Sequence, residues 1–304
     1  MERGDLTTVY VIGENPAQSE ADSQKAHHLL QGLDHLIVQD IFMTKTAQMA
    51  EVVLPASASW CEAEGTVTNS ERRVQRVRKA LEPPGEARGD IEILCALAKR
   101  LGHDWGSPTA EEAWNELRRL SPMHAGMSYP RLEALGGIRW PCYDENHPGE
   151  QFLHSRLWAE PPAQGRLAPF NPVAHEPPVD TLTEEFPLRL TTGRRLDSYN
   201  TGVQTAGYAS PLRWGETLDL SPEDAARYGV ADGEVVRVSS RRGAVEVPVR
   251  YDASVRPGLA FMSVHFTDVV DTNVLTIDAV DPKSGTAEFK ASAIRIDKLD
   301  SPPK

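Results

Sequence analysis

Polar residues in a glycine-containing turn near the start of the chain could bind a nucleotide. Gly13, Glu14 and Asn15 follow the apolar run 9–12, and Ser19 lies where a helical stretch begins. Backbone amides in a turn between a strand and a helix can approach a phosphate, and carboxylate or amide side chains can bond to guanine or ribose. The same residues are also typical of a tight turn capped by asparagine, so the sequence supports both interpretations.

A second pair of polar residues, Gln39 and Asp40, ends the next strand-like run of the sequence. A carboxylate in this position can accept both hydrogen bonds from the edge of a guanine, and the glutamine amide can contact a ribose. Alternatively, Asp40 caps the loop that leads to Thr44, which is itself a good N-cap for a short helix. Both roles are compatible with these residue types.

The last third of the chain contains a loop rich in groups that bind phosphate and polar heterocycles. Gly193 has no side chain and therefore permits close approach of the backbone to a ligand. Arg194 can hold a diphosphate through the planar donor fork of its guanidinium group. Further polar contacts are offered by the neighbouring residues Thr192, Ser198, Tyr199 and Asn200.

The elements around the first two groups alternate between strand and helix. Apolar runs predict strands at residues 9–12, 36–39 and 52–55, and the stretches 19–31 and 45–50 predict helices. Continuous apolar strands that alternate with helices indicate a parallel sheet covered on both faces. Ligands of such sheets bind at the carboxyl ends of the strands, where the candidate residues lie.

Two further helices and a long irregular stretch follow. Apolar residues at helical spacing predict helices over 90–101 and 110–120. Residues 121–187 are rich in proline, glycine and aromatic residues and show no sustained period. This composition predicts a long ordered connector on the protein surface.

After residue 186 the pattern changes to short alternating strands, which indicate a compact β-barrel. One helix interrupts them, with Ser221 as its N-cap, Pro222 as its first residue and Gly229 at its end. The predicted organisation is an α/β domain over 1–125, an extended connector over 126–185 and a barrel over 186–304.

The composition argues against several classes of protein. Lys and Arg number 32 against 44 Asp and Glu, and this net charge of −12 is the opposite of a nucleic-acid-binding face. No stretch approaches the roughly 20 apolar residues that cross a bilayer, so we expect a cytoplasmic protein. Cys61, Cys95 and Cys142 are too far apart to predict a zinc or iron–sulfur site. The basic run over residues 72–79 is either a solvated face or an electrostatic surface near an entrance.

Four segments are distinctive in combination. They are YVIGENPAQS at residues 10–19, VQDIFMTKTAQMAEVVLPA at 38–56, EGTVTNSERRVQRVRK at 64–79 and LTTGRRLDSYNTGVQT at 190–205. In this order they resemble the dimethyl sulfoxide reductase superfamily of molybdopterin enzymes, and its formate dehydrogenase branch in particular. The resemblance extends over nearly the whole chain and matches the C-terminal part of the large subunit.

The resemblance implies a fold and a cofactor. The fold is a Rossmann-like α/β lobe with a parallel sheet, followed by a six-stranded double-psi β-barrel similar to aspartate decarboxylase. The cofactor is a pair of molybdopterin guanine dinucleotides that hold molybdenum or tungsten. The resemblance further implies that Arg194, Ser198 and Asn200 contact the cofactor and that Asn273 and Lys290 lie close to the pterins. Some relatives have Glu and His at positions 195 and 198, so this sequence departs from them there.

The resemblance also implies an activity, the oxidation of formate to carbon dioxide with electrons leaving through iron–sulfur clusters. The catalytic residues, metal ligand and iron–sulfur cluster of the family lie upstream, so we expect no catalytic residue and no metal ligand in this segment, which alone should be inactive. Expected partners are the upstream domains and iron–sulfur, NAD or flavin electron-transfer subunits. Alternatives are a nitrate reductase-type or formylmethanofuran-type enzyme, or a non-catalytic lobe as in the iron–sulfur subunit of complex I.

Overall fold

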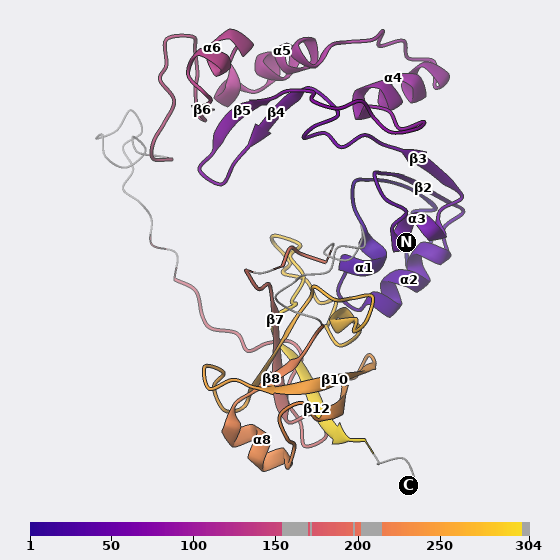
Figure 1. Ribbon diagram of the computed structural model, residues 1–304, viewed down its shortest axis with the longest axis vertical. Coiled ribbons are helices and arrows are strands. Elements are labelled where there is room, and N and C mark those ends of the chain that lie inside the picture. Colours follow the sequence, from indigo (N-terminus) through magenta and orange to yellow (C-terminus); the bar gives the residue numbers. More distant parts are fainter. Residues whose placement is uncertain (154–169, 171, 197, 202–214, 300–304) are drawn as a thin grey trace. The chain divides into compact units, whose positions relative to one another are not determined.

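The computed structural model describes residues 1–153, 170, 172–196, 198–201 and 215–299. The chain forms two compact units (Figure 1): the first consists of Met1–Val53 together with His175–Lys304, and the second of Leu54–Ala174. Every binding residue predicted from the sequence belongs to the first unit, which contains a sheet lobe (Met1–Val53) and a β-barrel.

A three-stranded sheet in the order β1-β2-β3 forms the core of the sheet lobe. Its strands are β1 (Thr8–Ile12), β2 (His35–Asp40) and β3 (Val52–Pro55), and its helices are α1 (Pro16–Ser19), α2 (Ser23–Gln31) and α3 (Lys45–Met49). β1 and β2 pair in parallel, with Val9 beside Leu36 and Val11 beside Val38. The three predicted strands are confirmed, because β-branched and aliphatic residues in these runs pack well on a pleated surface.

The helix predicted over residues 19–31 needs correction, since α2 begins only at Ser23 and Ser19 is the last residue of the separate helix α1. Asp22 separates them with a left-handed backbone (φ 48°), and its carboxylate accepts a hydrogen bond of 3.3 Å from the Lys25 amide. Aspartate tolerates this conformation because its short side chain bonds to the local backbone. Thr44 caps α3 as predicted, since its Oγ1 accepts a hydrogen bond of 3.1 Å from the Ala47 amide.

Six strands close the barrel in the order β10-β8-β11-β7-β12-β9. They are β7 (Leu188–Gly193), β8 (Leu218–Leu220), β9 (Val235–Ser239), β10 (Ala244–Tyr251), β11 (Leu259–Ser263) and β12 (Ser292–Lys298). The pairs β10–β8 and β11–β7 are parallel and the others are antiparallel, so the barrel is mixed. Helix α8 (Pro222–Tyr228) begins and ends as predicted: Ser221 Oγ accepts a hydrogen bond of 3.0 Å from the Asp224 amide, and Gly229 has a φ of 65°.

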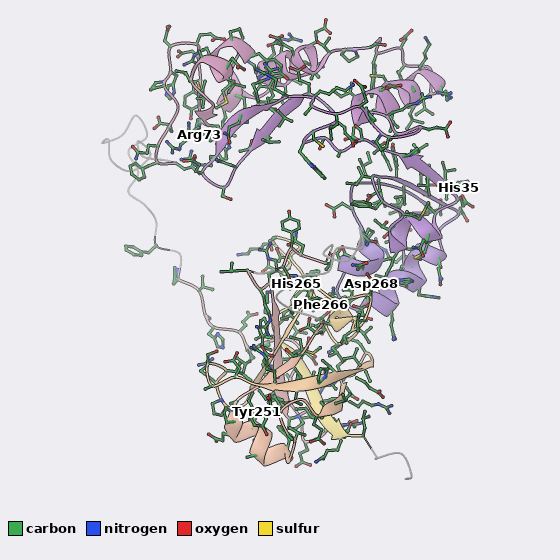
Figure 2. The ribbon with its side chains drawn as sticks, viewed as in Figure 1. His35, Arg73, Tyr251, His265, Phe266 and Asp268 are labelled. Atoms are coloured by element: carbon green, nitrogen blue, oxygen red, sulfur yellow. The ribbon has the colours of Figure 1, made fainter. Side chains whose placement is uncertain are left out.

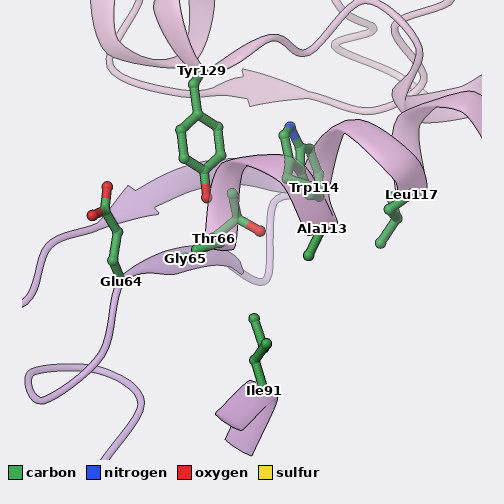
Figure 3. A pocket seen from close by; sticks show the side chains of 9 residues that line it. Glu64, Gly65, Thr66, Ile91, Ala113, Trp114, Leu117 and Tyr129 are labelled. Atoms are coloured by element: carbon green, nitrogen blue, oxygen red, sulfur yellow. The ribbon is translucent and has the colours of Figure 1, made fainter. Parts of the chain in front are cut away.

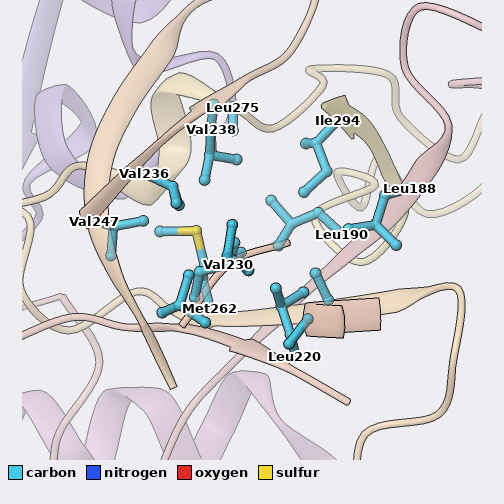
Figure 4. Close-up of a cluster of buried hydrophobic side chains, with 14 of the residues drawn as sticks. Leu188, Leu190, Leu220, Val230, Val236, Val238, Val247, Met262, Leu275 and Ile294 are labelled. Carbon is cyan, nitrogen blue, oxygen red and sulfur yellow. The ribbon is translucent and has the colours of Figure 1, made fainter. Parts of the chain in front are cut away.

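The barrel interior is filled by aliphatic side chains that alternate along the strands (Figure 4). In β7, Leu188 and Leu190 point inward and are fully buried, whereas Arg189 between them is half-buried. Met262 of β11 and Ile294 of β12 meet them in the same cluster. Burial of each such side chain contributes about 1.5–3 kcal/mol, so the interior supplies most of the stability of the barrel.

Polar contacts join the sheet lobe to the barrel within the first unit. The Asn273 amide, in the short helix η2 (Thr272–Val274), donates to the backbone oxygens of Gln18 and Ser19 at 3.3 Å each. Ser23 Oγ donates to Asp271 at 2.8 Å, and Lys45 Nζ donates to the Thr267 carbonyl at 3.0 Å. These contacts fix α1, α2 and α3 to the segment that follows β11.

The second unit combines a small antiparallel sheet with helices. Its strands are β4 (Gly65–Thr68), β5 (Arg73–Val77) and β6 (Ile138–Arg139), and its helices are α4 (Asp90–Arg100), α5 (Ala110–Leu120), η1 (Pro122–His124) and α6 (Tyr129–Ala134). The predicted helices α4 and α5 are confirmed. Thr109 and Glu112 form a capping box at the start of α5, with the Thr109 amide 2.7 Å from the Glu112 carboxylate.

The described ends of the predicted connector pack against both units. At its start, Met127, Tyr129 and Leu132 are buried in the core of the second unit, together with Trp114 of α5. At its end, Asp180 accepts hydrogen bonds from Arg242 at 2.6 Å and from the Ala293 amide at 2.9 Å. These stretches are therefore parts of the two units, although the predicted domain boundaries themselves remain a prediction.

The basic run of the second unit is neutralised by local carboxylates. Arg73 bonds to Glu71 at 2.9 Å, Arg76 pairs with Glu64, and Arg78 pairs with Glu133. Hydrogen bonds from Arg139, and then from Arg73, lower the pKa of Glu71 from 4.5 to about 2. The ion pairs favour the interpretation of this run as a solvated face.

An open pocket of about 230 Å³ lies between β4 and the helices of the second unit (Figure 3). Its wall includes the apolar side chains of Ile91, Trp114 and Leu117, which come from two helices, together with the ring of Tyr129. Nothing in its lining identifies a ligand. In the part of the chain that the structure describes, no helix combines the length and apolar character needed to cross a bilayer.

Candidate functional site

The turn after β1 is built on Gly13, which has a φ of 64° and donates its amide to the Gln39 carbonyl at 2.8 Å. Only glycine adopts this conformation at little cost. Glu14 is exposed. Asn15 does not cap α1; its Oδ1 accepts hydrogen bonds from Thr46, at 3.1 Å from the amide and 2.8 Å from Oγ1. The turn is therefore fixed to α3, which leaves its backbone and Glu14 at the surface.

Gln39 and Asp40 lie at the end of β2 but in different environments. Gln39 is fully buried, and its Oε1 accepts a hydrogen bond from the Tyr10 hydroxyl. Asp40 is half-buried and accepts from the Phe42 amide at 2.9 Å, as expected for a carboxylate that caps the following loop. Gln39 thus supports the turn from inside, whereas Asp40 lies at the edge where a ligand could meet it.

The barrel side of the candidate site begins at the end of β7. Thr192 Oγ1 donates to the Phe289 carbonyl at 2.7 Å, and Lys290 Nζ donates to the Thr192 carbonyl at 2.6 Å. A Cβ added at Gly193 would lie 2.9 Å from the Phe261 ring, so a larger residue would displace this strand end. Burial, and then the charge of Arg194, lower the pKa of Lys290 below its ordinary value of 10.5.

The loop after β7 presents its polar groups in one short segment. The Arg194 guanidinium donates to Asn200 Oδ1 at 3.0 Å, and Asn200 adopts a left-handed backbone with a φ of 43°. Tyr199 is 76% exposed. Ser198 Oγ is buried and has no hydrogen-bond partner among the described residues. A buried hydroxyl without a partner is costly, and a polar ligand group could satisfy it.

His265, which is labelled in Figure 2, supports this loop through both nitrogens of its ring. Its ring is fully buried: Nε2 lies 2.8 Å from the Arg195 amide, and Nδ1 lies 2.5 Å from the Asn200 carbonyl. The amide can only donate and the carbonyl can only accept, so the neutral ring carries its proton on Nδ1. The sequence offered no signal for this role except a lone histidine, which is more often structural.

Arg195, where some relatives have Glu, belongs to the barrel. Its guanidinium pairs with Asp219 and lies 4.8 Å from the centre of the Phe261 ring. Asp219 also accepts a hydrogen bond of 2.8 Å from Arg250. Burial raises the pKa of Asp219, but hydrogen bonds from Arg250, Thr217 and Arg195 more than offset burial, and the pKa lies below its ordinary value of 3.8. The arginine at position 195 therefore forms an ion pair in the barrel wall.

The structure brings the turn after β1 and the loop after β7 together through Gln18. Its Oε1 accepts from Asn15 Nδ2 at 3.1 Å, and its Nε2 donates to the Thr201 carbonyl. Ser19 joins the same contact through its backbone, which accepts from Asn273. Asn273 itself is 1% exposed and faces α1. Local sequence gives no signal for this role of Gln18, because its partner Thr201 lies 183 residues away in the chain.

Glu216 is a further residue without a signal in the sequence. It is 3% exposed and accepts from the Ser263 amide at 2.9 Å, two residues before His265. Burial raises its pKa above the ordinary value of 4.5, although hydrogen bonds from Ser263 oppose this shift. Among the described residues, no group of three or more His, Cys, Asp or Glu side chains is arranged to hold a metal ion.

Two family models match the chain over both parts of this site. The model described as Molybdopterin oxidoreductase matches residues 1–100, and the model of the Molydopterin dinucleotide binding domain matches residues 188–293. The chain belongs to the molybdopterin oxidoreductases. The predicted family is thereby confirmed, and all the candidate binding residues predicted from the sequence of this molybdopterin oxidoreductase lie within the two matched segments.

Relatives with established names agree with this assignment. The chain is 41% identical to F420-dependent formate dehydrogenase 2 subunit alpha of Methanococcus maripaludis, over 96% of this chain and 43% of the relative. It is 36% identical to the assimilatory nitrate reductase catalytic subunit of Bacillus subtilis, over 96% of this chain and 42% of the relative. This molybdopterin oxidoreductase therefore spans less than half the length of these relatives.

A solved structure supports the fold. Acetylene hydratase from Pelobacter acetylenicus matches with a TM-score of 0.71 and 20% identity, over 96% of this chain and 44% of that protein. At this level of identity the match concerns the fold alone. The parallel sheet with helices and the closed six-stranded mixed barrel thus belong to a fold that a solved structure shares over nearly the whole chain.

Proposed function

We propose that the chain is the cofactor-binding portion of a bis-pterin formate dehydrogenase that holds molybdenum or tungsten. The observation that carries the proposal is the linkage of two candidate binding segments, residues 13–15 and 194–200, through Gln18 in one compact unit. The 41% identity to a formate dehydrogenase alpha subunit supports the choice of substrate.

The residues of the loop fit a molybdopterin guanine dinucleotide. Arg194 and Lys290 offer two cationic groups, and the charge of Arg194 helps to lower the pKa of Lys290. A diphosphate beside them would relieve this repulsion and raise the pKa of Lys290, because an anion favours the charged form. The buried Ser198 hydroxyl, which lacks a partner within the described residues, offers a donor or acceptor for the pterin or the phosphates.

Each candidate residue then has a defined task. Arg194 binds phosphate or a pterin carbonyl, while Asn200, Tyr199 and Ser198 provide shorter polar contacts. On the sheet lobe, the backbone of Gly13 approaches the ligand, and Glu14 and Asp40 accept hydrogen bonds from guanine. Other candidate residues position the site, because their side chains or backbones contact other parts of the protein: Asn15, Ser19, Gln39, Thr192, Gly193 and Asn273. When bound, the cofactor supplies the two-electron chemistry.

Finer features of the fold belong to the same proposal. We infer that the sheet lobe is part of a Rossmann-like domain and that the barrel has double-psi topology, as its parallel pairs β10–β8 and β11–β7 permit. The predicted domain boundaries at residues 125 and 185 are part of the same proposal. Under it, the cofactor is bound between a lobe of the α/β type and the barrel.

For the whole protein, we propose the oxidation of formate to carbon dioxide with electrons passed to iron–sulfur clusters. The catalytic residues, the metal ligand and the nearest cluster would then lie in other parts of a longer, cytoplasmic polypeptide. Its partners would be iron–sulfur, NAD or flavin electron-transfer subunits. The name of the Methanococcus relative, a subunit alpha, supports the idea of a multi-subunit enzyme.

Binding of guanosine 5′-diphosphate to the 304-residue chain, measured by calorimetry, tests the cofactor assignment. We expect binding, and we expect Arg194→Ala to weaken it about tenfold or more, since hydrogen bonds to charged groups are worth about 1.5–3 kcal/mol. Arg256→Ala, which removes an exposed arginine from the turn before β11, is the matched control and should bind normally. A wild-type chain without affinity for the nucleotide would refute the assignment.

A nitrate reductase is the second candidate, because the Bacillus relative is 36% identical. The longer protein that contains this chain, isolated with its metal, distinguishes the two activities. Formate-dependent reduction of a dye supports the proposal. Nitrate-dependent oxidation of a reduced dye, without activity on formate, would replace it.

A further inference from the structure

Gln18 connects the two candidate binding segments through both ends of its amide. Oε1 accepts from Asn15 of the turn at 3.1 Å, and Nε2 donates to the Thr201 carbonyl at the end of the barrel loop. The side chain is 3% exposed, so neither bond can be replaced by bulk water without opening the contact. A buried glutamine amide in this position stabilises the protein only when both of its hydrogen-bond partners are in place.

His265 fixes the same loop at two other backbone atoms. Its Nε2 accepts from the Arg195 amide at 2.8 Å, and its Nδ1 donates to the Asn200 carbonyl at 2.5 Å. Arg195, Asn200 and Thr201 are thus each bonded at one backbone atom by two fully or nearly fully buried side chains. The side chains of Arg194 and Tyr199 remain exposed.

We propose that Gln18 and His265 are positioning residues that hold the barrel loop against the turn after β1 and make the two segments one binding site. The inference rests on the proposed function, since it assigns these residues to the same cofactor site. Neither side chain needs to touch the cofactor. A ligand that binds the turn meets backbone groups at Arg195, Asn200 and Thr201 that are already held by hydrogen bonds, so the entropy lost on binding is smaller.

The chemistry of the two residues allows substitutions that remove one bond at a time. Gln18→Glu keeps an oxygen for the Asn15 amide but has no donor for the Thr201 carbonyl. His265→Gln places an amide oxygen near the Nε2 position and keeps an acceptor for the Arg195 amide, whereas His265→Asn keeps only a donor near Nδ1. His265→Leu keeps bulk but loses both bonds.

Amide hydrogen exchange of the ligand-free chain tests the arrangement directly. The Arg195 amide should exchange about tenfold faster in His265→Leu and His265→Asn than in the wild type, because loss of one net hydrogen bond changes an equilibrium by this order. His265→Gln should restore protection. A purely space-filling role for His265 would leave leucine as good as glutamine, and that outcome would overturn the proposal.

The affinity for guanosine 5′-diphosphate tests the link between the segments. In the wild type, Asn15→Ala and Arg194→Ala should be coupled, so that their joint effect departs from the product of the single effects by about fivefold or more. In Gln18→Glu this coupling should vanish. Gln31→Glu, which adds the same charge at the exposed end of α2, is the control and should keep it.

The two measurements separate this inference from the proposed function. If the wild type binds no nucleotide but exchange at Arg195 responds as expected, the cofactor assignment fails while the loop arrangement stands. If the nucleotide binds and Gln18→Glu leaves the coupling unchanged, the cofactor assignment stands and the positioning role of Gln18 is refuted.

Discussion

The barrel and the sheet lobe of the first unit are stabilised in different ways. The barrel is closed and encloses a cluster of 15 buried apolar side chains, whereas the corresponding cluster of the sheet lobe has six. The lobe instead relies on polar contacts to the barrel, such as Asn273 to Gln18 and Ser23 to Asp271. A closed barrel has no free edge and buries its core alone, but a three-stranded sheet needs a neighbour.

The comparison predicts that truncation in the barrel has the largest effect. Leu190→Ala should lower the free energy of unfolding by about 3 kcal/mol, within the usual 2–5 kcal/mol, because the closed wall cannot collapse into the cavity. Leu36→Ala in β2 should cost less, since the smaller cluster can relax. Urea unfolding of both variants measures the difference, and a larger loss for Leu36→Ala would contradict the comparison.

Removal of the buried carboxylate in the barrel wall should follow in size. Asp219→Asn removes the anion that pairs with Arg195 and Arg250. We expect the free energy of unfolding to fall by about 2 kcal/mol, because two guanidinium groups lose their buried partner but remain partly exposed to water. Glu246→Gln is the matched control on the same barrel. Its pair with Arg237 is half-exposed, so we expect a change of no more than about 0.5 kcal/mol. Equal effects in urea unfolding would contradict this distinction.

Loss of a polar contact between lobe and barrel should have a smaller and more local effect. Asn273→Ala removes two hydrogen bonds of 3.3 Å and should cost about 1 kcal/mol. Amide exchange should accelerate in α1 and α2 but not in the barrel strands. Asn69→Ala, which changes an exposed residue of the second unit, should leave exchange in α1 and α2 as it is.

The smallest effect concerns pH, where two carboxylates act in opposite directions. Burial raises the pKa of Asp271 above its ordinary value of 3.8, so its contribution to stability grows as the pH falls from neutrality toward that value. The pKa of Asp219 is lowered, so its contribution is present above 3.8 and is lost as the pH falls through its folded pKa. The free energy of unfolding, measured at a series of pH values, should depend less on pH between neutrality and 3.8 in Asp271→Asn. It should depend less on pH below 3.8 in Asp219→Asn. A profile unchanged in either variant would refute the corresponding assignment.

Much of the local structure could be predicted from the sequence because short-range interactions determine it. Thr44 and Ser221 bond to amides three residues ahead, and Gly229 adopts the left-handed backbone that only glycine favours at a helix end. The strands of the sheet and the barrel follow from apolar periodicity. The break at Asp22 was missed because a single capping residue inside a helical pattern gives a weak signal.

The sequence predicted where the candidate binding residues lie in the chain, but only the tertiary structure decided what each side chain touches. Gln39 and Asn273 were predicted as ligand contacts, yet both are buried and bond to Tyr10 and to the backbone of α1. Gln18 and Asp219 carried no signal at all. Their partners lie far away in the chain, and local sequence patterns do not predict such long-range contacts.

The sequence by itself determined the family and most of the secondary-structure elements, including those that carry the two candidate binding segments. It did so because caps, turns and apolar periods depend on residues within one or two turns of chain. Tertiary structure alone decided that the turn at Gly13 and the loop at Arg194 are linked, because that depends on contacts such as Gln18 to Thr201, between residues 183 positions apart. Such contacts require that the lobe and the barrel pack against each other.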